Sequence, residues 1–311
     1  MIFKRFSPHT LAVIQALFVT FLWATSWVLI KFGLKDIPPL TFAGLRYTLA
    51  FICLCIPVLG SSSRRAQLQA LRLNDWLQLM LLGLVFIAVT QGAQFIALSY
   101  LPATTLTLLL NMSAVIVALL GGIMLAERLT GRQWLGMGVF LVGIILYFFP
   151  VAMPASEQLG LLAAITAVLA NAVSSILGRH INRRAHINPL VVTFVSIGVG
   201  GCVLLIIGLM QSGFPQPTLL NWVIIAWLAA INTAFAFTLW NHTLRSLSAV
   251  ESSIINNSIT IQIALLAWLF LGERISLQAV LGLILVAGGV MLVQFKGRIF
   301  NRAAMTNPSE V

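Results

Sequence analysis

The stretch that decides the fold runs from Trp76 to Ala126 and reads WLQLMLLGLVFIAVTQGAQFIALSYLPATTLTLLLNMSAVIVALLGGIMLA. It lies between Asp75 and Glu127, and none of its 51 residues is charged. As one α-helix it would be roughly 76 Å long, whereas the hydrocarbon core of a bilayer is about 30 Å thick. Two membrane-spanning helices are therefore predicted, with a break at 99–102, where Pro102 suits the start of the second helix.

The composition extends this prediction to the whole chain. Of its 311 residues, 60% belong to the set AVILMFWYC, only 8% are charged, and the mean hydropathy is +1.03. Soluble domains carry roughly a quarter charged residues, disordered chains have low hydrophobicity, and collagen needs a glycine repeat. These classes are excluded, and an all-α integral membrane protein is expected. The ten predicted transmembrane helices lie near residues 10–33, 39–59, 76–98, 102–125, 132–150, 158–178, 188–210, 219–244, 249–271 and 276–295.

The net charge of +11 is spread over short basic clusters between the apolar runs. This pattern is typical of membrane topology rather than of a nucleic-acid footprint, so no nucleic-acid partner is expected. Ten spans place both termini on one side, and 14 of the 18 Lys and Arg residues fall on that side. The positive-inside rule makes it the cytoplasm, which predicts a multi-pass protein of a bacterial-type inner membrane with both termini cytoplasmic.

The sequence also matches itself, without gaps, at a shift of 146 residues from the third to the fifth predicted span. Asn111 meets Asn257, and the Glu-Arg pair that begins at Glu127 meets the pair at Glu273. Each unit holds five spans, an odd number, so the two units are predicted to be inverted repeats. The expected division is a first repeat at 1–150, a second at 151–297 and a short cytoplasmic tail at 298–311. Two such halves can open a shared site to either side in turn, which predicts alternating access.

Together, the ten spans, the 5+5 repeat, the stretch IPPLTFAGLRY at 37–47 and the repeated Glu-Arg pair resemble the EamA family of the drug/metabolite transporter superfamily. The resemblance covers nearly the whole chain. It implies a central cavity lined mainly by spans 1, 3, 4, 6, 8 and 9, and efflux or uptake of small metabolites such as amino acids. Many members carry a proline near the middle of spans 4 and 9. Here Ala114 and Thr260 lie near those places, which leaves no basis for a proline hinge.

Polar side chains at membrane depth are the candidates for solute binding, because they cost free energy there and tend to face a cavity or the bundle interior. Amides both donate and accept hydrogen bonds, so they can hold a zwitterion or a hydroxyl-rich solute. The alternative for each amide is a hydrogen bond between helices, and for each tryptophan plain packing. The candidate substrate-binding residues are Trp23, Trp27, Gln91, Gln94, Asn111, Asn171, Asn232 and Asn257.

Three charged residues are predicted to have gating or structural roles. Glu127 and Glu273 each lie at a helix end, and Arg46 lies about seven residues into the second span, where it can snorkel or form an ion pair. Held in the cavity instead, Arg46 would favour an anionic group.

Paired glycines mark the fifth and tenth spans. Gly136 and Gly143 are seven residues apart and share one helix face, and Gly282 and Gly289 repeat this spacing. Small residues let helices approach closely, so the two spans are expected to pack on one another as a scaffold. A homodimer interface is the competing interpretation, and the chain is expected to be a monomer or a homodimer.

The sequence offers no signature of catalysis, a metal or another cofactor. It contains no Gly-x-Ser-x-Gly elbow, no His-Glu-x-x-His and no phosphate-binding loop. Cys53, Cys55 and Cys202 are expected to be apolar packing residues. The predicted function is a secondary transporter for small-molecule solutes that most plausibly exports amino acids or related compounds. The alternative is a permease for drugs, sugars, nucleosides or organic acids, or a channel-like facilitator.

Overall fold

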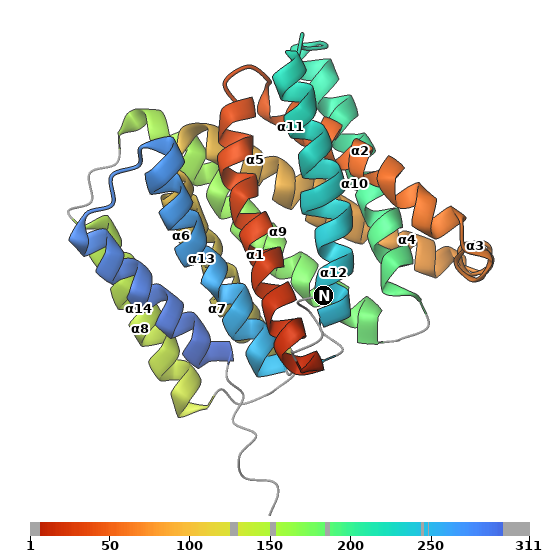
Figure 1. Ribbon diagram of the computed structural model, residues 1–311. Helices are drawn as coiled ribbons and strands as arrows, with labels where there is room; N and C mark the ends of the chain where they lie inside the picture. Colours follow the sequence, from red (N-terminus) through yellow and green to blue (C-terminus); the bar gives the residue numbers. More distant parts are fainter. Residues whose placement is uncertain are drawn as a thin grey trace, which may run out of the picture.

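The fold is known from a computed structural model that describes residues 7–124, 130–149, 154–183, 187–243, 246–247 and 249–294. All regular structure in these ranges is helical, and the helices form one bundle (Figure 1). The first half holds α1 (Pro8–Gly33), α2 (Pro39–Leu59), α3 (Ser62–Gln69), α4 (Leu73–Leu82), η2 (Gly83–Gln91), α5 (Gly92–Tyr100), α6 (Ala103–Leu110), α7 (Met112–Met124) and α8 (Gly131–Phe148). The second half holds η3 (Ala155–Glu157), α9 (Gln158–Arg183), α10 (Pro189–Ser212), α11 (Leu219–Ala229), η4 (Ala230–Phe235), α12 (Ala236–Thr243), α13 (Ala249–Leu271) and α14 (Leu277–Gln294).

Nine helical segments within the described ranges are long and apolar enough to cross a membrane. The third, fourth, sixth and eighth of these are composite, since they join α4–η2–α5, α6–α7, η3–α9 and α11–η4–α12. Helix α14 contributes a shorter apolar stretch, Leu277–Val293. The all-helical membrane class is therefore confirmed, and the number ten stays a prediction.

Two composite spans contain a π-helical segment, which the sequence analysis did not foresee. In η2 the Thr90 hydroxyl donates to the Val85 carbonyl at 2.9 Å, and in η4 the Thr233 hydroxyl donates to the Leu228 carbonyl at 2.8 Å. Both hydroxyls reach back five residues, as the wider turn requires. Shifting η2 by the 146 residues of the repeat gives 229–237, which contains η4. The wide turn thus occurs at equivalent places in both halves.

Helices α8 and α14 lie side by side at one edge of the bundle (Figure 1), and glycines allow their close approach. A Cβ atom added at Gly143 would lie 2.7 Å from the Val286 nitrogen, and one added at Gly289 would lie 2.6 Å from the Phe140 nitrogen. Lower numbers on one helix meet higher numbers on the other, so the two are antiparallel. The predicted packing of the fifth span on the tenth is confirmed, and within one chain.

A second repeat-related pair, α2 and α10, packs in the same antiparallel way at the opposite edge (Figure 1). A Cβ atom at Gly208 would lie 2.7 Å from the Thr41 Cα, and one at Gly201 would lie 3.0 Å from the Thr48 nitrogen. Most of the polar side chains described below come from helices between these two antiparallel pairs, and Arg46 comes from α2.

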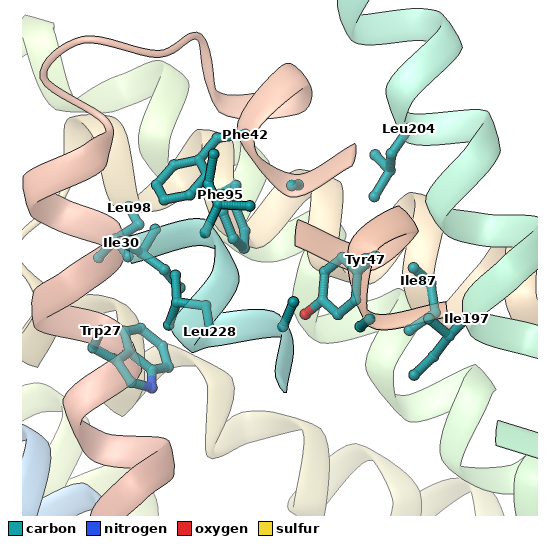
Figure 2. Packing of buried hydrophobic residues seen from close by; sticks show 14 of the residues in the cluster. Trp27, Ile30, Phe42, Tyr47, Ile87, Phe95, Leu98, Ile197, Leu204 and Leu228 are labelled. Carbon is teal, nitrogen blue, oxygen red and sulfur yellow. The ribbon is translucent and has the colours of Figure 1, made fainter. Parts of the chain in front are cut away.

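The largest apolar cluster lies where α1, α2, α5 and α11 meet (Figure 2). The rings of Phe42 and Phe95 meet edge to face at 5.5 Å, and both side chains are fully buried. Trp27 and Leu228 pack into the same cluster. This cluster fixes α1 and α2 of the first half against α11 of the second.

The fourth span is interrupted at Asn111, which separates α6 from α7. The equivalent Asn257 lies inside the continuous helix α13. A helix interruption therefore exists without a proline, and only in the first of the two repeat-related spans.

Candidate functional site

Two amides connect the fourth span with helices of the second half. The Asn171 amide of α9 donates to the Ser113 hydroxyl of α7 at 3.0 Å. The Asn111 amide, at the interruption of the fourth span, donates to the Thr260 hydroxyl of α13 at 3.2 Å. Asn111 follows the last residue of α6 and keeps a helical backbone conformation, with its backbone amide bonded to the Thr107 carbonyl at 3.2 Å.

The same helix α13 is hydrogen-bonded to α1. The Gln262 amide donates to the Thr20 hydroxyl of α1 and to the Ser258 hydroxyl of its own helix, both at 3.1 Å. The Gln262 carbonyl oxygen is buried and has no hydrogen-bond partner. Such a group is costly in an apolar interior, so it favours a partner that arrives from outside the protein.

Asn232 connects η4 with α1 and is fully buried. Its amide nitrogen donates to the Ser26 hydroxyl at 2.8 Å, to the Thr25 hydroxyl at 3.2 Å and to the Leu22 carbonyl. The Trp23 indole donates in return to the Asn232 backbone carbonyl at 3.1 Å. The π-helical turn places Asn232 among these four residues of α1.

The next residue, Thr233, continues the series to α2. Its hydroxyl accepts a hydrogen bond from the Arg46 guanidinium at 3.3 Å, and the guanidinium also lies 5.1 Å from the centroid of the Tyr47 ring. The residues of these links form what we call the polar belt: Thr20, Ser26, Arg46, Asn111, Ser113, Asn171, Asn232, Thr233, Thr260 and Gln262. Each link joins a residue of the first half to a residue of the second.

A cavity of about 270 Å³ lies beside the belt, between α2, η2, α9, α10 and α12. Its wall is mostly apolar with hydroxyl and amide groups interspersed, and no charged side chain of the described residues lines it. The lining residues are Tyr47, Leu82, Phe86, Ile87, Gln91, Ser174, Ser175, Gly178, Val192, Thr193, Ser196, Ile197 and Phe237.

The cavity differs in part from the one implied by the family resemblance. Spans three, six and eight line it as expected, but spans two and seven take part as well. No described residue of spans one, four and nine lines it, and polar side chains of these spans bond to partners in the opposite half.

The structure brings some predicted site residues together and separates others. Gln91 lines the cavity, whereas Gln94 is partly buried outside the lining. Trp23 packs at 5.3 Å on Phe237, a cavity residue, but Trp27 is packed in the apolar cluster. Asn111, Asn171 and Asn232 belong to the belt, and Asn257 is buried in α13. Solute contact by each of these residues stays a prediction.

Glu273 lies at the end of the bundle where α1 ends and α6 begins. Its carboxylate accepts hydrogen bonds from the Ala103 amide at 2.7 Å, the Thr104 amide at 3.2 Å and the Thr104 hydroxyl at 2.8 Å. An anion is stabilised at a helix N-terminus by the helix dipole and the free amides. Glu273 therefore caps α6 of the opposite half, while Glu127, its repeat partner, lies outside the described residues.

Lys31 reinforces the same end of the bundle. Its ammonium group donates to the Leu98 carbonyl at 2.7 Å and to the Leu101 carbonyl at 2.8 Å, where α5 ends. Cations are favoured at helix C-termini, so Lys31 is the counterpart of the Glu273 cap. The sequence shows only a lysine near the end of a span, so it does not reveal that Lys31 bonds to the carbonyls of Leu98 and Leu101.

The chain was also compared with known proteins. A sequence model of the EamA-like transporter family matches residues 10–149 and again residues 158–295. The uncharacterized transporter YoaV of Bacillus subtilis is 25% identical over 291 residues, covering 89% of this chain and 94% of YoaV. A probable amino-acid metabolite efflux pump of Escherichia coli is 29% identical over 133 residues, covering 42% of this chain and 41% of the pump.

One solved crystal structure shares the fold. It superposes with a TM-score of 0.64 at 17% identity, covering 91% of this chain and 96% of that chain. The two family matches span both halves of the bundle, as the internal repeat requires. The chain belongs to the EamA-like transporter family.

Proposed function

We propose that this protein is a secondary transporter for small metabolites and that it exports amino acids or related compounds. In this proposal ten spans form two inverted repeats, 1–150 and 151–297, with both termini in the cytoplasm. Solute is held centrally, at the polar belt and the adjoining cavity. The two repeats exchange conformations, and the site opens to each side of the membrane in turn.

The observation that carries this proposal is the composition of the polar belt. Its links use hydroxyl and amide groups of residues such as Asn111, Asn232 and Gln262, and each link crosses between the two halves. A solute held there contacts both moving parts, so its binding is sensitive to their relative position. Neutral hydrogen bonds within a membrane are worth only roughly 0.6 kcal/mol on average, so a solute can exchange with them at low cost.

The size of the cavity favours a small metabolite over a drug. Pockets for drug-sized ligands occupy about 300 to 1,000 Å³, and the cavity holds about 270 Å³. Its mixed wall suits a solute with an apolar part and several hydrogen-bonding groups. The partial similarity to a probable amino-acid metabolite efflux pump supports amino acids as the first class to test.

The two equivalent π-helical segments, η2 and η4, support a mechanism in which the halves move alike. Wide turns of this kind are frequent at functional sites and weaken the regular hydrogen-bond ladder locally. They supply bending points in spans three and eight, both of which line the cavity.

The test is counterflow in proteoliposomes that contain the purified protein. Vesicles are preloaded with an amino-acid mixture and offered one labelled amino acid at a time, with sugars, nucleosides, organic acids and a cationic dye as parallel probes. Saturable uptake that is stimulated by internal amino acid supports the proposal. Counterflow of another solute class alone would refute amino-acid transport, and non-saturable flux would indicate a channel-like facilitator.

A further inference from the structure

Arg46 is a buried cation in the membrane-spanning part of the bundle. Its side chain lies seven residues from the start of α2 and is 7% exposed. The guanidinium donates one hydrogen bond, to the Thr233 hydroxyl at 3.3 Å, and the Tyr47 ring lies 5.1 Å away. The buried Nε atom of Arg46 has no hydrogen-bond partner.

Within the described ranges, Arg46 also forms no ion pair. Asp36 bonds to Asn221, Glu251 pairs with His9, and Glu273 caps α6. A buried charge without a counter-charge is expensive in a membrane, and such residues mark solute pathways more often than they stabilise the fold. The positive charge of Arg46 is therefore available to an incoming anion.

The position of Arg46 relates this charge to the cavity. Tyr47, whose ring the guanidinium contacts, is part of the cavity wall. Among the residues that the structure describes, no charged side chain forms part of this wall. Arg46 thus places a positive charge next to a residue of the cavity wall, where the low dielectric strengthens its interaction with an anion.

We propose that Arg46 supplies the counter-charge for a carboxylate on the transported solute. The solute class is then amino acids and other monocarboxylates, and amines without a carboxylate are excluded. The apolar lining, which includes Phe86, Ile87 and Ile197, accommodates a branched or aromatic side chain. This inference rests on the proposed transport function and assigns Arg46 as a residue that determines which solutes bind.

A purely structural role for Arg46 makes a different prediction about stability. If Arg46 held α2 to η4, replacing it by a neutral residue would destabilise the protein. If its charge awaits a solute, Arg46→Gln removes an uncompensated buried charge and leaves stability unchanged or raised. Transport of carboxylates then falls without a loss of stability.

The experiment uses leucine with two analogues, 4-methylpentanoate, which lacks the ammonium group, and 3-methylbutylamine, which lacks the carboxylate. In wild-type proteoliposomes, 4-methylpentanoate competes with labelled leucine and 3-methylbutylamine does not. Arg46→Gln weakens competition by 4-methylpentanoate roughly tenfold or more, as expected for loss of a nearby unit charge in a medium of low dielectric. Arg46→Lys, which keeps the charge without the planar fork, gives an intermediate value.

Lys35→Gln is the matched control, because it removes one positive charge from an exposed position just after α1. It leaves the preference for the carboxylate unchanged. Equal competition by the amine in the wild type, an unchanged preference in Arg46→Gln, or a lowered melting temperature of Arg46→Gln would overturn the inference.

A thermal-shift measurement separates this inference from the transport proposal. If Arg46 binds carboxylates, 4-methylpentanoate raises the melting temperature of the wild type but not of Arg46→Gln, whether or not flux is observed. Absence of leucine flux with this differential shift would refute amino-acid transport and keep the carboxylate site. The same shift in both proteins, or a shift in neither, refutes the carboxylate site.

Discussion

The contact between α8 and α14 makes a quantitative prediction for the substitution Gly143→Ala. The added Cβ atom would lie 2.7 Å from the Val286 nitrogen and 2.9 Å from the Gly282 oxygen, whereas ordinary contacts begin at 3.4 Å. Both neighbours are backbone atoms and cannot rotate away, so the two helices must separate locally by about half an ångström. Overpacking of this kind costs about 1 to 3 kcal/mol.

Gly138, five residues earlier in the same helix, provides the matched control. A Cβ atom at Gly138 meets nothing within 4 Å. Gly138→Ala therefore adds helix propensity without a clash and is expected to stabilise the protein by about 0.5 to 1 kcal/mol. The two variants should differ by about 1.5 to 4 kcal/mol in opposite directions from the wild type.

The measurement is thermostability in detergent, followed as the fraction of monodisperse protein after heating. The same comparison can be made in α14. A Cβ atom added at Gly289 would meet backbone atoms of α8, whereas one added at Gly288 would meet nothing within 4 Å. Gly289→Ala should destabilise and Gly288→Ala should not. Equal stability of the two variants in either pair would show that the glycine contact does not hold the halves together.

Three further predictions concern the polar groups. Glu273→Gln weakens the cap on α6, so hydrogen exchange at the Ala103 and Thr104 amides should accelerate roughly 5- to 30-fold, corresponding to about 1 to 2 kcal/mol; unchanged exchange contradicts the capping role. Asn111→Leu removes the bond to Thr260 and should reduce counterflow while the protein remains folded, with the exposed Asn74→Leu as control; normal flux from Asn111→Leu would make this amide structural. Asn232→Leu leaves the groups on α1 without their donor and should lower stability by about 1 kcal/mol or more, and an unchanged melting temperature would contradict this.

The outline of the fold was predictable because it depends on local properties of the sequence. Apolar runs bounded by charges reveal membrane-spanning helices, since the cost of burying a charge in lipid acts on each segment separately. The spacing of Gly136 and Gly143, repeated at Gly282 and Gly289, likewise revealed which two helices pack together. The number of spans and the inversion of the repeats stay predictions.

The features that the sequence did not reveal depend on contacts between distant segments. Hydropathy does not distinguish a π-helical turn from an α-helical one, so η2 and η4 went unnoticed. The interruption at Asn111 has no proline to mark it, and the polar helix α3 was left unassigned between two spans. The sequence marks amides at membrane depth but not their partners, because Asn171 and Gln262 acquire partners only when α9 and α13 meet the first half.

The two π-helical segments, η2 and η4, also show how the two halves of the chain correspond in register. A π-turn arises when one residue is inserted into an α-helix, and an insertion in one copy alone would break the alignment of the two halves. Yet Trp76 before η2 and Leu101 after it meet Trp222 and Leu247 at one constant shift. The wide turn is therefore common to both halves in the same register, and neither half contains a residue there that the other lacks.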